Sequence, residues 1–318
     1  MVKSTLFKLH DGRWGIATRG DAGKDGEIKL EEGVLKAIPA LPEIIFHPST
    51  TVTKSDILDF KEEGFLLHNL LSTSECSHFI TEGEKAGFEA IPGVRDDYRS
   101  SQRITFDSPA LANLLWERIK AWVPVINISG DPHEKHIHGV TFLMQGTWQP
   151  LGLNSMFRLC RYLPGGHFAP HFDGHFVRSA QERSLQTFML YLNGNFEGGS
   201  TNFIHEDQHL FKNEDGKYCA EEKNIICSIQ PEAGLAIIFN HHRLHEGQQL
   251  KDGVKYILRT DIMFHNISQG IKTPSQDKAL ELLQEAERKE ASGDCLEAAE
   301  LYRKAFKLSP ELAASYGN

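Results

Sequence analysis

The chain has 318 residues, of which 40% are hydrophobic and 24% charged, values that suit one large or two ordinary globular domains. Its formal net charge of −9 argues against nonspecific binding to nucleic acid and against docking on an anionic membrane, so neither is an expected partner. No apolar run approaches the ~20 residues of a membrane helix, and the N-terminus lacks the apolar core of a secretory signal. Five scattered cysteines without a Cys-x-x-Cys pair indicate reduced thiols and a cytoplasmic protein, with a nuclear location left open.

Residues 1–60 contain short alternating runs, and we expect a peripheral arm or hairpin without chemistry. A strand-like run over 65–71 follows. Ser72 and Glu75 then form a capping box, and Ser108 precedes a proline at the first position of a second helix. We expect both helices to brace a sheet with apolar faces. These faces comprise Phe79, Ile80, Phe88, Leu111, Leu114, Leu115, Ile119 and Trp122.

From about residue 140 the pattern changes to short strands separated by Gly, Pro and Asn turns. Candidate strands cover residues 139–144, 156–162, 185–193, 234–240 and 254–264. Many short strands predict a mainly-β sandwich or jelly roll with supporting helices over 61–268, an α+β class overall. No Gly-x-Gly-x-x-Gly motif opens a helix, so a nucleotide-binding α/β fold is not expected.

The C-terminal part predicts a linker at 269–276 and a helical hairpin at 277–318, with helices over 279–290 and 296–308. Its small, aromatic and proline positions resemble a tetratricopeptide repeat, although Lys289 stands where an aromatic residue is usual. The matching positions are Ala286, Gly293, Ala298, Tyr302, Ala305 and Pro310. A single repeat cannot bury its own face, so we expect it to pack on the barrel, bind a partner or assemble with itself.

Two His-x-Asp pairs offer metal ligands, since residues i and i+2 of a strand share a face. His171 and Asp173 follow a strand and a Gly-rich turn, as a ligand-bearing segment would. His205 and Asp207 lie among charged residues in a loop-like segment. We therefore prefer the first pair.

A third ligand is available after the apolar strand at 235–239, where His241, His242 and His245 follow closely. Composition does not choose among them. The last strand-like run places Lys255 and Arg259 on one face. A cation that points inward among apolar residues is costly unless it meets an anion, so this face predicts a small dicarboxylate ligand.

The chain carries four successive motifs. They are Tyr162-x-x-Gly-Gly-x-Phe-x-Pro-His171-Phe-Asp173, residues 187–193, Gly-Gly-Ser-Thr at 198–201, and His245 with Lys255 ten residues on. In these motifs the chain resembles the prolyl 4-hydroxylases, which belong to the Fe(II)/2-oxoglutarate-dependent dioxygenases. The resemblance spans about residues 60–265 and implies a double-stranded β-helix, or jelly-roll, core. It also implies His171, Asp173 and His245 as metal ligands.

The same resemblance implies that Lys255 binds the distal carboxylate of 2-oxoglutarate. Because arginine often has this role in related families, Arg259 on the same strand face is the alternative anchor. Tyr162 and Tyr191 match positions that line the cosubstrate pocket, and Thr187, on the same strand face as Tyr191, is expected to join them.

The implied enzyme uses Fe(II), 2-oxoglutarate as cosubstrate and ascorbate as reductant. It hydroxylates a protein side chain, with proline as the best guess, and forms succinate and CO2. A protein or peptide substrate is expected, with a further protein partner at the C-terminal hairpin. The alternatives are a small-molecule 2-oxoglutarate oxygenase and a non-catalytic jelly-roll scaffold that binds a metal or ligand.

Other residues near the motif are not expected to bind the metal. His167, His175, His241 and His242 are expected at the surface or behind the ligands, and Cys160 in the core. Residues 178–183 beside the site are expected to form a flexible lid.

Overall fold

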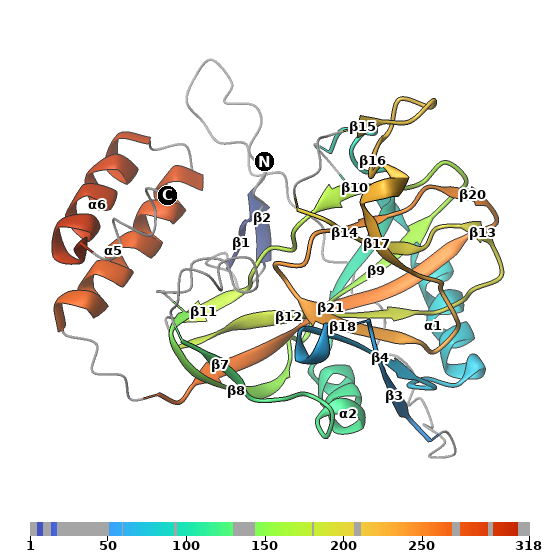
Figure 1. The fold of residues 1–318 in the computed structure, drawn as a ribbon, viewed down its shortest axis with the longest axis horizontal. Helices are drawn as coiled ribbons and strands as arrows, with labels where there is room; N and C mark the ends of the chain where they lie inside the picture. The colour runs from blue at the N-terminus through green and yellow to red at the C-terminus, as the bar shows by residue number, and fades with distance from the viewer. Residues whose placement is uncertain are drawn as a thin grey trace.

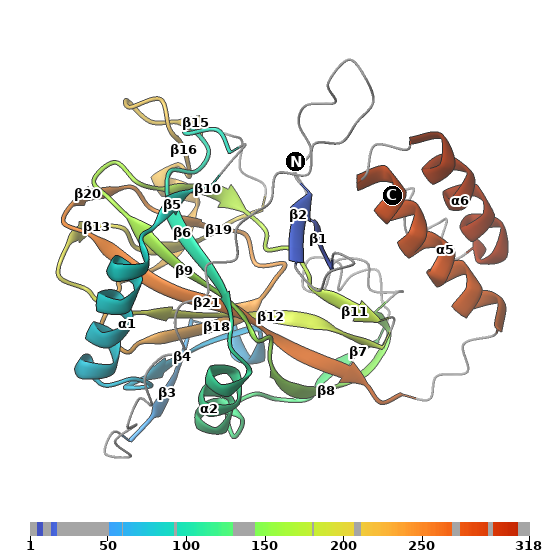
Figure 2. The same ribbon diagram turned by 180° about the vertical axis from the view of Figure 1, so that it is seen from behind.

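The computed structural model describes residues 5–8, 14–17, 51–58, 60–91, 94–129, 144–179, 181–206, 211–268, 274–291 and 295–310. Within these residues two sheets face each other, two helices cover the outer face of the larger sheet, and a helical hairpin lies to one side (Figures 1 and 2). The predicted mainly-β class with bracing helices is confirmed, and the two facing sheets agree with the predicted jelly roll.

The larger sheet is built from eleven strands. They are β3 (Thr53–Asp56), β4 (Gly64–His68), β5 (Glu89–Ala90), β6 (Gln102–Asp107), β7 (Ile126–Ile128), β8 (Gly146–Leu153), β9 (Met156–Tyr162), β11 (Val177–Ser179), β12 (Glu182–Tyr191), β18 (Ala236–Asn240) and β21 (Lys255–Asn266). The main order is β3-β4-β18-β12-β21-β9-β6-β5, with β11 beside β12, β8 beside β21, and β7 beside β8. All these pairings are antiparallel.

The smaller sheet has the order β10-β19-β14-β17. Its strands are β10 (Phe168–His171), β14 (Thr201–Ile204), β17 (Ile225–Ile229) and β19 (His245–Gly247). Three further strand pairs lie outside the two sheets. They are β1 (Thr5–Lys8) with β2 (Trp14–Ala17), β13 (Glu197–Gly198) with β20 (Leu250–Asp252), and β15 (Phe211–Lys212) with β16 (Tyr218–Cys219).

Both predicted helix starts are confirmed. In α1 (Thr73–Ala86), the Ser72 hydroxyl accepts a hydrogen bond from the Glu75 amide, and the Glu75 carboxylate accepts one from the Ser72 amide. In α2 (Pro109–Ile119), Ser108 accepts a hydrogen bond from the Leu111 amide. The expectation that Trp122 lies in the core is wrong, because α2 ends at Ile119 and the indole is exposed.

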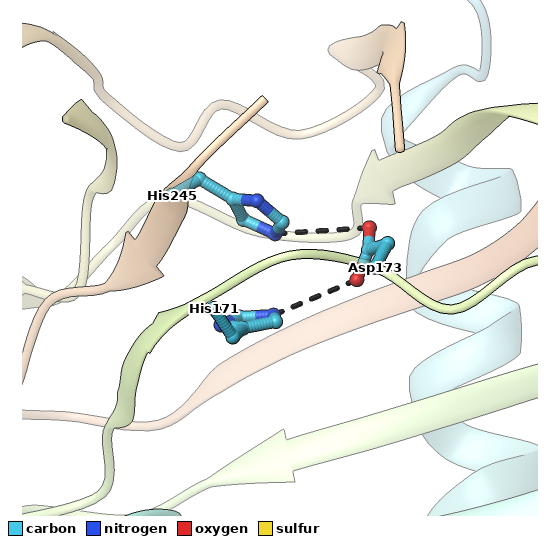
Figure 3. A group of neighbouring side chains, drawn as sticks. All are labelled: His171, Asp173 and His245. Atoms are coloured by element: carbon cyan, nitrogen blue, oxygen red, sulfur yellow. Dashed lines mark ion pairs between the residues drawn. The ribbon is translucent and has the colours of Figure 1, made fainter. Parts of the chain in front are cut away.

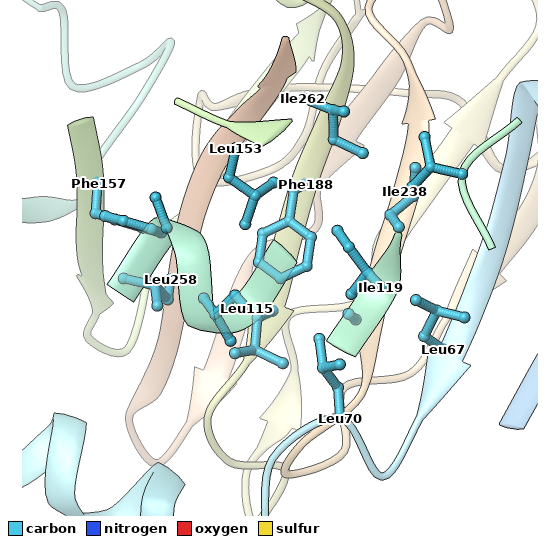
Figure 4. Packing of buried hydrophobic residues seen from close by; sticks show 14 of the residues in the cluster. Leu67, Leu70, Leu115, Ile119, Leu153, Phe157, Phe188, Ile238, Leu258 and Ile262 are labelled. Carbon is cyan, nitrogen blue, oxygen red and sulfur yellow. The ribbon is translucent and has the colours of Figure 1, made fainter. Parts of the chain in front are cut away.

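The central strands β12 and β21 bury both of their faces, and successive side chains alternate between two environments. One face packs against α1 and α2 in the main hydrophobic cluster, drawn in Figure 4. It includes Leu115, Ile119, Phe188, Leu190, Ile238, Leu258 and Ile262. The other face looks toward the smaller sheet, where polar side chains lie among Met189, Phe239 and Ile257. The site is on this inner face.

The larger sheet and the C-terminal hairpin both begin earlier in the chain than predicted. β3 joins the large sheet before residue 61, where we expected the domain to begin. The paired β1 and β2 are the described part of the expected N-terminal hairpin. Helix α5 (Pro274–Ala291) starts inside the predicted linker, with proline at its first position, and packs against α6 (Cys295–Leu308) through Ala279, Leu283 and Ala305. A helical hairpin is confirmed, whereas its tetratricopeptide character stays a prediction.

Two other expectations concern segments near the domain's edge. The predicted strand at 139–144 lies outside the described residues except for Met144. In the segment predicted to form a lid, β11 pairs with the beginning of β12, and Arg178 forms an ion pair with Glu182. Its flexibility stays a prediction, and Ala180 lies outside the described residues. Among the described helices, none has the combination of length and apolar sequence that a membrane crossing requires.

Candidate metal centre and cosubstrate pocket

Three side chains converge between the two sheets (Figure 3). His171 ends β10, Asp173 lies two residues on, and His245 begins β19. β10 and β19 pair with His171 opposite His245, so backbone pairing places the two imidazoles side by side. The Nε2 atom of His171 lies 3.5 Å from Oδ1 of Asp173, and that of His245 lies 3.7 Å from Oδ2. One ligand atom from each residue lies within 4.8 Å of the others.

Both imidazoles direct an unprotonated Nε2 atom into this group. Their Nδ1 atoms lie 2.7 Å and 2.9 Å from the carbonyl oxygens of Ala169 and Arg243 respectively. Because a carbonyl only accepts hydrogen bonds, each Nδ1 carries the proton and each Nε2 a lone pair. Burial lowers the pKa of both rings, to about 3 for His245, and keeps them neutral at pH 7.

This donor set fits a divalent metal. The Nε2 atom of His171 is buried and has no hydrogen-bond partner. Lone pairs that face a carboxylate repel it unless a cation lies between them. Two imidazoles and one carboxylate on one side suit Fe(II) with open positions opposite. The residues present therefore fit an iron centre.

Asp173 is held as a carboxylate by two neighbours. The Arg259 guanidinium lies 2.5 Å from Oδ1, and the Thr187 hydroxyl donates a 2.5 Å hydrogen bond to Oδ2. Burial alone would raise its pKa, but Arg259, His245 and His171 more than offset this and hold the pKa well below its ordinary value. Thr187 lines the same cavity as Tyr162 and Lys255, and within it its hydroxyl contacts the Asp173 carboxylate.

The neighbouring histidines lie behind or beside the ligands. His241 is buried, 3.0 Å from the Thr187 hydroxyl and 2.8 Å from that of Ser184. His175 and His242 approach each other at 3.2 Å between their Nε2 atoms. His167 is buried against Ser100, so it is not at the surface. Of the alternative pair, Asp207 lies outside the described residues.

Lys255 lies at the far end of the same cavity and is fully buried. Its ammonium donates a 2.5 Å hydrogen bond to the Gly199 carbonyl, and the rings of Tyr162 and Tyr191 are each centred 5.4 Å away. Gly199 has a φ of +70°, a conformation that glycine adopts readily, which brings its carbonyl to this place. Among the described residues no carboxylate forms an ion pair with Lys255. The cavity therefore ends in a buried cation that lacks a counter-ion.

The two candidate anchors thus have different surroundings. Arg259 also lines the cavity, but its guanidinium pairs with Asp173. Four residues of strand place it about 13 Å along β21 from Lys255. Cys160 is buried between the two anchors on the adjacent strand and faces Ile257. An incoming dicarboxylate therefore meets an available cation at Lys255.

Two functional candidates were not expected from sequence reasoning. Arg99 and Arg158 line the cavity together with Arg259. For Arg158 a signal existed, because it precedes Cys160 and Tyr162 by two and four residues on β9 and therefore shares their face. Arg99 lies before β6, where no periodicity placed it.

A family model matches the part of the chain that contains this site. Residues 157–260, which contain the metal-ligand group and both candidate anchors, match the model of the 2OG-Fe(II) oxygenase superfamily. The chain contains a 2OG-Fe(II) oxygenase domain. The match confirms the predicted resemblance to the Fe(II)/2-oxoglutarate-dependent oxygenases, which implies Fe(II) and 2-oxoglutarate as cofactor and cosubstrate. The prolyl 4-hydroxylase character stays a prediction.

Solved structures similar to this chain include prolyl hydroxylases. A viral collagen prolyl hydroxylase from Paramecium bursaria Chlorella virus-1, bound to 2-oxoglutarate, is 21% identical with a TM-score of 0.37 over 63% of this chain and 96% of that chain. A Pseudomonas putida prolyl-4-hydroxylase is 16% identical with a TM-score of 0.38 over 63% and 91%. A Trichoplax adhaerens prolyl hydroxylase, in complex with a hypoxia-inducible-factor peptide fragment, is 15% identical with a TM-score of 0.39 over 63% and 83%. These similarities are too low to transfer a substrate. No curated protein matches the chain.

The buried lysine of the oxygenase domain predicts a pH dependence. Burial lowers the pKa of Lys255 to about 7, and burial also raises the pKa of Tyr162 and Tyr191, which stay neutral. Only the charged ammonium attracts a carboxylate, so above pH 7 binding must also take up a proton. We expect the apparent Kd for 2-oxoglutarate to rise about fivefold between pH 7 and 8 and about tenfold between pH 8 and 9. Calorimetric titration at several pH values measures this, and a flat profile would contradict it. Lys255→Arg should flatten the profile, because arginine stays charged.

Proposed function

We propose that the chain is an Fe(II)- and 2-oxoglutarate-dependent dioxygenase that hydroxylates a protein side chain. Its sequence motifs resemble those of prolyl 4-hydroxylases, and proline is the residue that this resemblance favours. Ascorbate is the proposed reductant that keeps the iron ferrous. Succinate and CO2 are the coproducts.

One observation carries the proposal: a single cavity has a neutral His, Asp, His donor group at one end and an uncompensated buried lysine at the other. The donor group fits a metal, and the lysine fits a carboxylate. A five-carbon keto dicarboxylate that binds the metal through its keto acid leaves its second carboxylate free for Lys255. A module that only bound a metal would have no use for a buried cation that costs stability.

The side chains of the domain hold the reactants and tune their protonation. Lys255 binds the distal carboxylate, and the Tyr162 and Tyr191 rings exclude water from that contact. The Thr187 hydroxyl fixes the orientation of the Asp173 carboxylate. When bound, Fe(II) would activate O2, of which one oxygen atom oxidises 2-oxoglutarate to succinate and CO2 and the other converts a substrate C–H bond to C–OH.

Proteomic hydroxylation profiling tests the protein-substrate claim. Cells with the wild-type chain should show peptides that carry an added oxygen, and these should disappear with His171→Ala and persist with His175→Ala. Succinate formation without any enzyme-dependent peptide oxidation would reject a protein substrate. In that case a small-molecule oxygenase would be the remaining function.

The C-terminal hairpin is proposed as a partner-binding element. Its two helices pack on each other through a small apolar core and stand to one side of the sheets in both views (Figures 1 and 2). Truncation after Gly270 should leave the rate of 2-oxoglutarate decarboxylation within about twofold while it reduces partner recovery in a pull-down. Loss of cooperative unfolding in the truncated chain would instead show that the hairpin is part of the domain's core.

A further inference from the structure

Guanidinium groups gather around one side of the cavity, away from Lys255. Arg158 on β9 lies directly opposite Arg259 on β21, and Arg103 on β6 lies opposite Cys160. Strand alternation puts Arg103, Arg158 and Arg259 on the inner face. Arg99 reaches the same cavity from the segment before β6. Like charges directly opposite each other destabilise a sheet, so this arrangement has a cost.

Few carboxylates offset the cluster. Asp173 pairs with Arg259, and Oδ2 of Asp261 lies 3.6 Å from Arg158. Glu246 also lines the cavity, but it accepts hydrogen bonds from Asn202 and the Ala220 amide. Four guanidiniums therefore face three carboxylates among the described residues, and a bound metal would claim one of these, Asp173. The pKa of Arg103 falls to about 10, through burial and the charges of its arginine neighbours.

Arg99 joins this charge to the metal ligands through a stack of groups. Its guanidinium lies 4.3 Å from the centre of the Phe168 ring, which stacks on the His171 imidazole at 3.5 Å. Its Nε atom donates to the Ser101 hydroxyl, and no carboxylate pairs with it among the residues that the structure describes. A positive group is thus fixed one ring away from the His171 imidazole.

We propose that the substrate of this domain carries a carboxylate close to the carbon that is hydroxylated, and that Arg99 and Arg158 bind it. The inference rests on the proposed function and adds the chemical class of the substrate. A carboxylate placed there would neutralise part of the excess charge, and arginine forks match its geometry. In an acidic peptide the group is an Asp or Glu side chain beside the target residue; a free carboxylic acid would present the same chemistry.

Two matched synthetic peptide pools test the proposal on the full chain. Both contain proline at a fixed position, and they differ only in that Glu and Asp flank it in one pool and Gln and Asn in the other. Peptide binding to the chain with Fe(II) and 2-oxoglutarate bound is measured by the fluorescence anisotropy of the peptides under argon. The acidic pool should bind at least tenfold more tightly, and Arg99→Gln or Arg158→Gln should each remove about tenfold or more of that difference. The exposed Arg178→Gln is the matched control and should keep the full difference.

The remaining arms separate the outcomes. Equal binding of the two pools, with succinate still formed from 2-oxoglutarate, would overturn the inference and leave the proposed function standing. Absence of succinate under every condition would instead reject the proposed function. If Arg99→Gln and Arg158→Gln raise the KM for 2-oxoglutarate as much as they weaken peptide binding, the cluster serves the cosubstrate and the inference fails. A further outcome is that succinamate-type monocarboxylates displace the acidic pool and that no peptide is oxidised. This result would support the inference with a small carboxylic acid as the substrate.

Discussion

His171→Ala should abolish tight Fe(II) binding and reduce 2-oxoglutarate decarboxylation by about 1,000-fold or more. The substitution removes one of two neutral imidazoles whose Nε2 lone pairs face the Asp173 carboxylate. The remaining ligands cannot compensate, because backbone pairing holds His245 in place and Asp173 is fixed by Arg259 and Thr187. Metal content after gel filtration and the rate of succinate formation measure the two effects.

His175→Ala is the control for this prediction. It removes a histidine from the same motif that lies outside the ligand group and contacts His242. Its metal content and turnover should stay within about threefold of wild type. Equal losses in the two variants, or full iron content in His171→Ala, would mean that the ligand group is misassigned.

Lys255→Ala should raise the apparent KM for 2-oxoglutarate by about 100-fold or more, far above the effect of Arg259→Ala. Lys255 is the buried cation of the cavity that has no carboxylate partner among the described side chains, whereas Arg259 already pairs with Asp173. Loss of Arg259 should therefore weaken metal binding more than cosubstrate binding. Steady-state kinetics at saturating iron separates the two effects. The reverse order of KM changes would make Arg259 the anchor.

Lys255→Met separates the loss of charge from the loss of packing. Methionine fills a similar volume, so its KM should rise as in Lys255→Ala while the fold is kept. The metal-free variant should also unfold at a higher temperature than wild type near pH 6, because the folded state no longer holds a charged amine whose pKa burial has lowered to about 7. A lower melting temperature would show that the ammonium contributes to folding.

Strand periodicity predicted the parts of the site that lie on long strands. Lys255 and Arg259 share a face on β21, as alternation requires. Tyr162, which the family resemblance pointed to, lies opposite Lys255 on β9. The helix starts at Ser72 and Ser108 could also be predicted from the sequence, because capping depends on local residues. These features need only short-range rules.

Contacts between distant segments were beyond such rules. The choice of His245 among three histidines depends on the pairing of β10 with β19, which no local pattern specifies. β8 was missed because Pro150 and two glycines, Gly146 and Gly152, interrupt its pattern, although neighbouring strands supply its pairing. The pairing of Arg259 with Asp173 likewise depends on how loop and strand meet in three dimensions.

The most direct test of the account is the fate of 2-oxoglutarate with the purified full-length chain, Fe(II), ascorbate and oxygen, with and without the acidic peptide pool. We expect equimolar succinate and CO2, stimulation by the pool, and loss of both products in His171→Ala. A wild-type chain that binds Fe(II) and 2-oxoglutarate yet forms no succinate, with or without peptides, would contradict it.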